Sequence, residues 1–258
     1  LSKAFAATGN EKFRQLAFDN MQFLLDKFSN NKTNEFFHSW KNAIAKQPAF
    51  LDDYAFLIQA LIQLQETTGD IAFLEKAKVI AEYVIETFSD NVTDFFFYTN
   101  ESQKDVVVRK KEVYDGAQPS GNAVMAENLF RLGLYFDLPE WRDKSTRMIK
   151  SLGNAIVRYP TSFGVWACSL QENTIGSNEI VIVADEPQPV LKQVLKEYIP
   201  HKVIMSAKKE SNLFPLLSGK EKTGEMTLYL CRNYACEKPV FSIQALVAII
   251  RRNELKIS

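Results

Sequence analysis

Polar side chains gather in residues 111–122, which read KEVYDGAQPSGN. The stretch ends in a Gly-Ala-Gln-Pro-Ser-Gly-Asn turn that opens into a run with helical spacing, so its charged groups stand at one helix mouth. Glycoside hydrolysis needs two carboxyl groups several ångströms apart, one protonated as general acid and the other ionised as base or nucleophile. Glu112 and Asp115 are therefore candidates for such a pair.

A second polar group, LDDY at 51–54, occupies the same place before its own helix. A shift of 68 residues lays Asp52 over Ser120 and Tyr54 over Asn122. Helices that run side by side in one direction bring their N-termini together, and the free N–H groups there favour anionic or oxygen-rich ligands. We therefore predict one pocket at these helix mouths. Its predicted catalytic residues are Asp53, Glu112 and Asp115, and its predicted substrate-binding residues are Asp52, Tyr54, Ser120 and Asn122.

Helix capping is the alternative interpretation of the same residues. Asp52 and Ser120 have the side chains of N-caps, and Asp53 adds favourable charge to a first helical turn. A simple cap does not require Glu112 or Asp115. The two interpretations differ in pKa: carboxyl groups crowded in a partly desolvated pocket should have at least one raised pKa, whereas caps should have lowered ones.

The elements that must position these groups are repeated along the chain. Residues 1–38 align without a gap to residues 61–98, and residues 55–77 align to residues 123–145. Each copy has apolar residues at three- and four-residue spacing, a break such as Gly69-Asp70, and a second periodic run. The pattern predicts antiparallel helical hairpins in three copies.

Aromatic extended segments follow two of the hairpins and predict short strand pairs at one end of them. EFFHS at 35–39 aligns with FFFYT at 95–99, and the second segment continues to a β-branched partner at Val106 to Arg109. Long, unequal links of this kind favour a closed (α/α) toroid over an open solenoid. We therefore predict a mainly α fold, a helical-hairpin toroid over residues 1–177.

This toroid is expected to be incomplete in the chain. The first copy starts at Leu1, the equivalent of Leu61, which is already halfway down a helix, so its front half should lie upstream. The chain supplies three recognisable hairpins and a further helix predicted at 163–172.

The pattern changes after Gly176. Apolar and β-branched runs predict strands that begin near Ile180, Val203 and Thr227, with a helix opened by proline between the first two. These elements predict a small α/β insertion at 178–240. The final helix is predicted at 242–252, and we expect residues 241–258 to pack back on the toroid as the partner of the helix at 163–172.

Cys231 and Cys236 have a C-x4-C spacing in CRNYAC. This differs from the C-x-x-C of thioredoxin-like redox sites, and no second Cys/His pair stands nearby to complete a zinc site. Structural thiols at a strand end are the favoured interpretation, and a redox or metal role is the weaker alternative. We expect no metal and no cofactor.

Charge and hydropathy exclude several classes of partner. Lys and Arg number 31 against 31 Asp and Glu, so no net positive charge favours nucleic acid. The most apolar segments are shorter than the roughly 20 residues that cross a bilayer, and LSKAFAATGN lacks the apolar core of a signal peptide, so no membrane partner is expected. Three cysteines do not make a disulfide framework, which favours a reducing, cytoplasmic location.

Five motifs in order carry a resemblance to a known family. They are FLDDYAFLIQALIQLQETTGD, FFFYT, RKKEVYDGAQPSGNAVMAENLFRLG, IVIVAD and LYLCRNYACEKPV. Together they resemble the C-terminal region of the thioredoxin-domain-containing family that includes spermatogenesis-associated protein 20 and its bacterial relatives. The resemblance implies a six-hairpin toroid related to certain glycosidases and N-acylglucosamine 2-epimerases, with a thioredoxin-like domain upstream.

Two functions follow as expectations. In the first, the toroid binds or processes a carbohydrate-like, polyhydroxylated small molecule at the helix mouths. In the second, it is a non-catalytic binding or scaffolding module for the thioredoxin-like partner domain. Fold analogy alone supports the sugar, and a fold does not determine a function.

Overall fold

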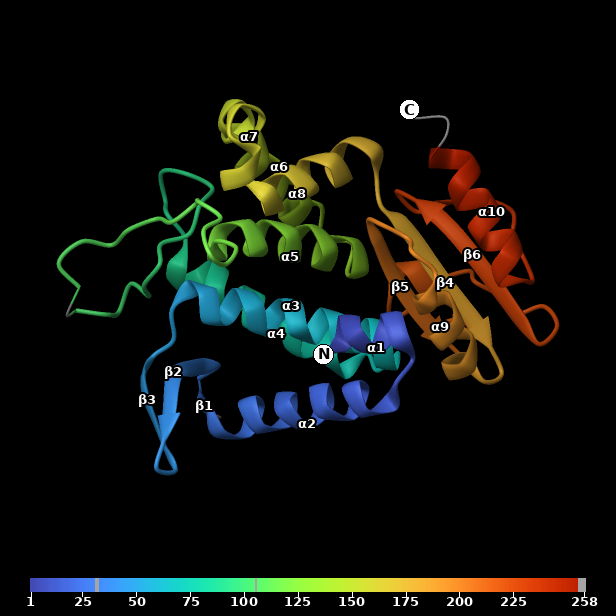
Figure 1. Cartoon of the computed structure of the whole chain (residues 1–258), viewed down its shortest axis with the longest axis horizontal. Coiled ribbons are helices and arrows are strands. Elements are labelled where there is room, and N and C mark those ends of the chain that lie inside the picture. Colours follow the sequence, from blue (N-terminus) through green and yellow to red (C-terminus); the bar gives the residue numbers. More distant parts are fainter. Residues whose placement is uncertain (31–32, 105, 255–258) are drawn as a thin grey trace.

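The computed structural model describes residues 1–30, 33–104 and 106–254, and helices dominate it (Figure 1). The helices are α1 (Ser2–Thr8), α2 (Glu11–Lys27), α3 (Leu51–Thr68), α4 (Ala72–Phe88), α5 (Gly121–Tyr135), α6 (Pro139–Ser151), α7 (Gly153–Arg158), α8 (Gly164–Ile175), α9 (Pro187–Lys196) and α10 (Ile243–Glu254), with short 3₁₀ turns η1 (Pro160–Ser162) and η2 (Pro215–Leu217). The strands are β1 (Ser29–Asn30), β2 (Glu35–Lys41), β3 (Ile44–Pro48), β4 (Asn178–Ala184), β5 (Lys202–Ala207), β6 (Met226–Arg232) and β7 (Ala235–Cys236). No helix in this described part is long and apolar enough to cross a bilayer.

The pairs α1–α2, α3–α4 and α5–α6 form helical hairpins, as the repeats predict. The first two hairpins turn at Gly9 and Gly69, whose φ angles of 67° and 71° lie in the left-handed region that glycine adopts without strain. The third hairpin has no glycine there; Asp137 takes a φ of 50°, and Pro139 then starts α6. The predicted mainly helical character is confirmed, and the closed toroid stays a prediction.

Helices α1, α3, α5 and α8 lie in one row, each in contact with the next (Figure 1). Each of α2, α4 and α6 packs against two neighbouring members of this row. The apolar positions shared by the repeats form the core between them, and the equivalent residues Leu61 and Leu129 are both fully buried. The row therefore brings the N-termini of α3 and α5 to one end of the helical layer and their C-termini to the other.

The strands after the first two hairpins are built unequally. Ser29 of β1 lies opposite Phe36 of β2, and β2 continues into an antiparallel pair with β3. The equivalent residues of the second copy, Ser89 and Phe96, make the same antiparallel pairing, but only as an isolated bridge. The repeat thus preserves the register of the pairing and not its extent.

The prediction of a strand at Val106 to Arg109 is wrong, since these residues form no strand in the structure. The Arg109 side chain instead holds this loop: its Nη2 donates to the Thr99 carbonyl at 2.7 Å, and its guanidinium lies 4.1 Å from the centre of the Phe97 ring. These two contacts of one side chain hold the segment, where the β-branched residues had suggested a strand hydrogen-bonded to its neighbour.

The predicted α/β unit is present. Its sheet has the order β5-β4-β6-β7, with β4 and β5 parallel through α9 and the other pairs antiparallel. The strands begin at Asn178, Lys202 and Met226, within two residues of the predicted positions. Every residue of β4 is buried, because this central strand is covered on both faces.

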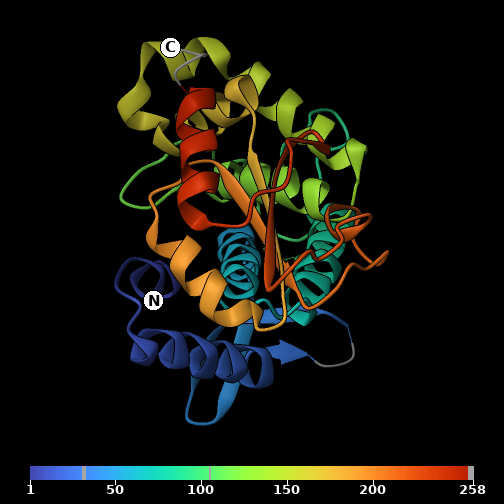
Figure 2. The ribbon, with the colours of Figure 1, turned by 90° about the vertical axis from the view of Figure 1, so that its right-hand side faces the viewer.

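The two faces of β4 belong to different cores. Val181 and Val183 pack into the core of the hairpin helices, whereas Ile180 and Ile182 pack under α9 and α10. Figure 2 shows α9 and α10 toward the viewer, with the hairpin helices behind them.

The final helix corrects the prediction made for residues 241–258. The α10 residues Ile243, Leu246 and Ile250 are buried in the core that contains Leu228 and Leu230 of β6. The helix therefore covers the sheet and does not pack back on α8. An apolar helix face was correctly predicted, but the sheet, which needs a cover on its outer face, is the surface that it contacts.

Candidate functional site

Tyr54 and Asn122 tie the extended segments to the helices at equivalent positions of the repeat. The Tyr54 hydroxyl accepts a hydrogen bond from the Phe36 N–H at 2.9 Å. Asn122, fully buried, accepts from the Phe96 N–H at 2.8 Å and donates to the Phe96 carbonyl at 3.0 Å and to the Glu112 carbonyl at 2.9 Å. Tyr54 and Asn122, two of the four predicted substrate-binding residues, therefore satisfy buried backbone groups of the fold.

Asp53 and Ser120 are both bonded to helix N-termini. Asp53 Oδ2 accepts from the Phe50 N–H at 2.9 Å, closing the first turn of α3, and it also lies 2.8 Å from Nδ1 of His38. Ser120 is the N-cap of α5, and its Oγ accepts from the Ala123 N–H at 3.2 Å. The capping interpretation is confirmed for Ser120. For α3 it is corrected, because the N-cap is Phe50 and not Asp52, and Asp53 completes a capping box from the third helical position.

Asp115 joins two elements through its two carboxylate oxygens. Oδ1 accepts from the Ser120 N–H at 3.0 Å, and Oδ2 accepts from the Val165 N–H at 2.8 Å in the first turn of α8. Glu112 is exposed, and its Oε1 accepts from the N–H groups of Val113 and Tyr114. The catalytic role assigned to these acids stays a prediction, since each of them already has backbone donors.

Asp52 has the raised carboxyl pKa that was expected for a pocket at the helix mouths. Burial raises the pKa of its carboxyl, and the nearby carboxylates of Asp53 and Glu112 raise it further. Its Oδ1 faces Gly121 so closely that a Cβ there would collide with it. The α3 and α5 mouths are therefore in contact, and the raised pKa belongs to Asp52, which the sequence assigned to binding.

Substitution of Asp115 and Asp53 separates two kinds of cap. Asp115→Asn should lose about 1–2 kcal/mol of unfolding free energy, because an amide has one acceptor oxygen and the two N–H donors then compete for it. Asp53→Asn should lose less than about 1 kcal/mol, since one oxygen serves both of its contacts. Chemical denaturation measures both, and equal losses would contradict this geometry.

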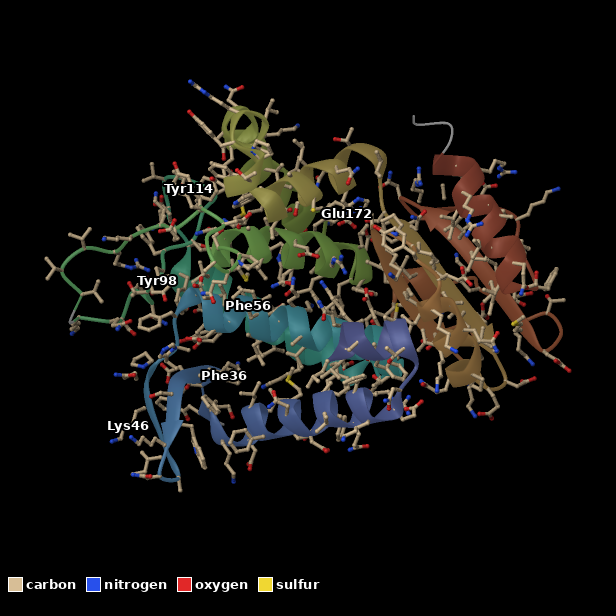
Figure 3. All side chains as sticks on the ribbon, in the orientation of Figure 1. Phe36, Lys46, Phe56, Tyr98, Tyr114 and Glu172 are labelled. Carbon is tan, nitrogen blue, oxygen red and sulfur yellow. A yellow bond between two sulfur atoms is a disulfide. The ribbon has the colours of Figure 1, made fainter. Side chains whose placement is uncertain are left out.

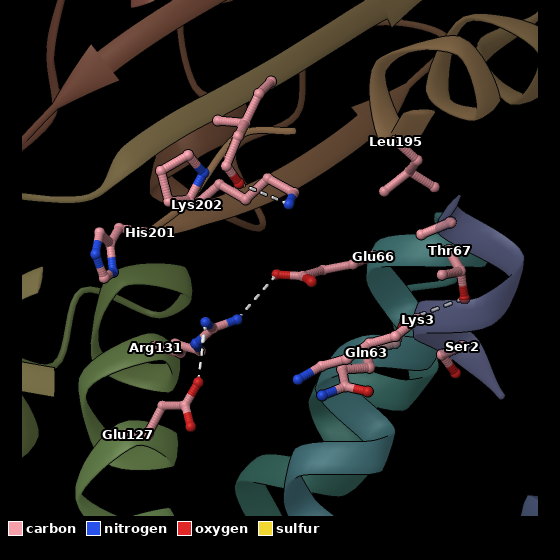
Figure 4. Close-up of a pocket in the computed structure, with 13 residues that line it drawn as sticks. Ser2, Lys3, Gln63, Glu66, Thr67, Glu127, Arg131, Leu195, His201 and Lys202 are labelled. Carbon is pink, nitrogen blue, oxygen red and sulfur yellow. Dashed lines mark hydrogen bonds and ion pairs between the residues drawn. The ribbon is translucent and has the colours of Figure 1, made fainter. Parts of the chain in front are cut away.

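A polar cavity of about 220 Å³ lies toward the other end of the helical layer, between α1, α3, α5 and the segment that leads into β5 (Figure 4). Figure 3 shows the separation: Tyr98 and Tyr114 lie near the predicted mouth, whereas Glu172 lies toward the sheet. The cavity is lined by charged side chains from four elements. The charged side chains are Lys3, Glu66, Glu127, Arg131 and Lys202.

Arg131 stands between two carboxylates in this cavity. Its Nη2 lies 3.0 Å from Glu127 Oε1, one helical turn earlier on α5, and its Nη1 lies 3.6 Å from Glu66 Oε1 on α3. The Arg131 side chain is 18% exposed, so it can be reached from the cavity. Figure 4 shows the three side chains converging across the gap between the two helices.

Glu66 is the most desolvated of these carboxylates. Burial raises the pKa of its carboxyl, against the opposing effect of the Arg131 charge. The Tyr135 hydroxyl donates to Glu66 Oε1 at 3.1 Å and accepts from the Ile204 N–H of β5 at 3.2 Å. The sheet therefore helps to position the carboxyl, and burial gives Glu66 a higher pKa than an exposed glutamate has.

Lys202 supplies positive charge from the first residue of β5. Burial lowers the pKa of its ammonium group, and Glu66 opposes that shift. The Nζ donates to the Ile199 carbonyl at 2.9 Å, which holds the stem in the cavity wall (Figure 4). A partly buried ammonium group is a suitable partner for an anionic ligand.

Glu172 and His201 extend the charged network toward α8. Burial disfavours the charged Glu172 carboxylate, but the nearby His201 side chain and the Arg131 charge outweigh it, so the Glu172 pKa is lowered. Glu172 Oε2 lies 3.7 Å from His201 Nδ1. This carboxylate therefore stays ionised beside the cavity.

Sequence reasoning missed this cavity, although one signal was present. Gln59 and Gln63 of α3 are the repeat equivalents of Glu127 and Arg131 of α5. The Gln59 amide donates to Glu127 Oε2 at 3.1 Å, so equivalent positions of two repeats touch across the row. Polar residues four apart on otherwise apolar helices form a polar stripe along α3 and α5, away from the helix mouths that were predicted as the site.

Cys231 and Cys236 form a disulfide between β6 and β7. The expectation of free structural thiols is therefore corrected. The hairpin turn between them, Asn233 and Tyr234, has φ angles of 49° and 62°, which bring the two strands into direct register. A two-residue turn explains why a C-x4-C spacing places both sulfur atoms on the same side of a hairpin.

Sequence comparison finds relatives among longer proteins, whereas no family model matches the chain. Human spermatogenesis-associated protein 20 is 31% identical over 204 residues, 74% of this chain and 26% of the human protein. The rat protein of the same name gives the same identity and coverage. An uncharacterized protein of Caenorhabditis elegans is 26% identical over 266 residues, 98% of this chain and 36% of that protein.

These similarities support the relation to that family which the five motifs indicate. The chain spans 26% of the human protein's length and 36% of the worm protein's. What the whole proteins bind or catalyse therefore comes to this chain only as a proposal.

Proposed function

We propose that the chain binds a polyhydroxylated small molecule carrying an anionic group, in the polar cavity between α1, α3, α5 and β5. The observation that carries the proposal is Arg131, held between the Glu66 and Glu127 carboxylates in the cavity wall. Carboxylates accept hydrogen bonds from ligand hydroxyls, while Lys3 and Lys202 offer positive charge to the anionic group. Sugar acids and sugar phosphates combine these features.

Chemistry on such a ligand would fall to the two glutamates. Glu66 is suited to hold a proton, because burial raises the pKa of its carboxyl. Glu127 lies 3.0 Å from the Arg131 guanidinium, and this ion pair holds its carboxyl in position at the cavity. A glycosidase-like or epimerase-like activity is the enzymatic form of this proposal, and simple binding is its minimal form.

The wider setting of the proposal comes from the family resemblance. In an (α/α) toroid the inner helices surround a central space, and a row such as α1, α3 and α5 would line part of it. A thioredoxin-like domain in the full-length protein and a cytoplasmic location belong to the same proposal. They rest on the motifs and the composition of the sequence.

A scaffolding module is the second candidate. The observation that favours it is that Asp53, Asp115 and Asn122 at the predicted mouth all bond to backbone groups. A mouth occupied in this way positions loops, and loops of this kind can contact a neighbouring domain.

Calorimetric titration of the purified chain distinguishes the candidates. The test compounds are glucose, glucuronate, glucose 6-phosphate and inorganic phosphate. We expect the two charged sugars to bind, and Lys202→Met or Glu127→Gln to weaken binding at least about tenfold. Lys46→Met, on the distant strand β3, is the matched control and should bind as the unchanged chain does.

Each other outcome has a defined meaning. Binding that survives in Lys202→Met and Glu127→Gln but is lost in Asp52→Asn would move the ligand site to the helix mouths. If phosphate binds as tightly as the charged sugars, the site recognises only the anionic group, and the proposal of a polyhydroxylated ligand is contradicted. A chain that binds none of the compounds would favour the scaffolding candidate.

A further inference from the structure

The disulfide at the edge of the α/β unit joins two residues that face each other across the β6–β7 hairpin. Cys231 and Cys236 are direct partners in the antiparallel pair of β6 and β7. The next pair outward, Leu230 and Glu237, is hydrogen-bonded, with the Glu237 N–H donating to the Leu230 carbonyl at 2.9 Å. Because the two kinds of pair alternate, the cysteines occupy a pair without backbone hydrogen bonds, where side chains approach most closely.

The two sulfur atoms differ in their surroundings. Cys231 is 3% exposed and packs in the sheet, whereas Cys236 is exposed. Both residues line a surface cavity of about 300 Å³ that Arg232, Glu237 and Asn253 complete. Because Cys236 is the more exposed of the two, an incoming thiolate should meet its sulfur first.

The hairpin is anchored by contacts that do not involve the disulfide. The Tyr234 hydroxyl donates to the Leu134 carbonyl at the C-terminus of α5 at 2.9 Å, and the Tyr234 N–H donates to Glu179 Oε2 at 3.0 Å. Glu179 is buried in β4, so this N–H serves a carboxylate that water cannot reach. Opening of the disulfide would leave the turn in place and the two cysteines adjacent.

We infer that Cys231 and Cys236 form a thiol–disulfide exchange site whose substrate is a dithiol. A thiolate of the dithiol attacks Cys236 Sγ, a new S–S bond forms there, and the Cys231 sulfur leaves as a thiolate that takes up a proton. The second thiol of the substrate then attacks its own mixed-disulfide sulfur and releases Cys236. Two electrons pass to the protein: the dithiol becomes a disulfide, and the chain gains two thiols.

A dithiol suits this geometry better than a monothiol. After the first attack the Cys231 thiolate stays beside the mixed disulfide, because the hairpin is anchored, and it can re-form the original bond. Only a second thiol that is already attached competes with this internal reversal. In the reverse reaction the reduced cysteines attack a disulfide substrate, which becomes a dithiol while the Cys231–Cys236 bond re-forms.

Thiol counting after treatment of the folded chain with a reductant tests the exchange. The chain has three cysteines, and Cys168 is free, so an alkylating reagent applied in denaturant should label one thiol before reduction and three afterwards. We expect dithiothreitol under native conditions to open the bond at least about tenfold faster than glutathione at equal thiol concentration. Reduction that occurs only in denaturant, or equal rates with the two reductants, would overturn the inference.

Single-cysteine variants test which sulfur is attacked. In a Cys168→Ser background, Cys231→Ser leaves Cys236 and Cys236→Ser leaves Cys231. Oxidised glutathione should modify the retained Cys236 at least about tenfold faster than the retained Cys231. Equal rates, or faster modification of Cys231, would contradict the assignment, and circular dichroism of both variants shows that the fold persists. If either variant unfolds, the wild-type rates with the two reductants decide the question.

Discussion

Asn122→Leu should lower the unfolding free energy by about 3–5 kcal/mol, the largest single effect we expect at the predicted helix mouth. Leucine has the same branching at Cγ but neither donates nor accepts, so the Phe96 N–H, the Phe96 carbonyl and the Glu112 carbonyl all lose their partner. Phe96 is fully buried, and water cannot replace the lost bonds to its backbone. Urea denaturation followed by circular dichroism measures the loss.

Ser120→Ala is the matched control for this prediction. Ser120 stands two residues away and makes one cap bond, to the Ala123 N–H. Its loss should cost about 1 kcal/mol. If Asn122→Leu lowers the unfolding free energy no more than Ser120→Ala does, the Asn122 hydrogen bonds do not stabilise the fold as described. A role of Asn122 in ligand binding at the mouth would then be favoured.

Arg131→Met should lower the unfolding free energy by about 3 kcal/mol at neutral pH. The substitution removes the positive charge between Glu66 and Glu127 and leaves Glu66 buried as an uncompensated carboxylate. Methionine retains most of the apolar stem, so lost packing contributes little. Arg147→Met is the control, because Arg147 forms an exposed ion pair with Asp94 and should cost less than about 1 kcal/mol.

The pH dependence of the Arg131→Met loss identifies its cause. Burial raises the pKa of Glu66, and removal of Arg131 takes away an effect that lowers it, so the folded variant holds the Glu66 proton more tightly than the unfolded chain does. Stability from this group is fully present below the unfolded carboxyl pKa of 4.5 and is lost as the pH rises through the folded value. The deficit of the variant should therefore shrink as the pH is lowered from neutrality toward about pH 5.

The double variant Arg131→Met/Glu66→Gln completes the test. Glutamine can keep the contact with the Tyr135 hydroxyl without carrying a charge, so it should restore most of the stability lost at neutral pH and flatten the pH dependence. A double variant that is destabilised by the sum of the two single effects would show that Arg131 acts through packing and not through the Glu66 charge.

The helices and strands of this protein follow from local sequence. The repeats place the turns at Gly9 and Gly69, and the apolar runs place the three main strands of the sheet within two residues of their predicted starts. Helix and strand periods depend on neighbours three, four or two residues away, so a single sequence contains them. The isolated bridge of Ser89 with Phe96 shows the limit of repeat reasoning, because the extent of a strand depends on what packs beside it.

For the candidate sites too, some features follow from the sequence alone and others from the tertiary structure. The sequence by itself determined that LDDY and PSGN occupy equivalent helix starts, and the contact of Asp52 with Gly121 agrees with that. Only the tertiary structure decided that Asp115 bonds the first turn of α8, that α10 covers the sheet, and that Arg131 meets Glu66 beside β5. These contacts join distant segments, and their formation depends on which buried surfaces and charges find a partner across the whole chain, which no local period encodes.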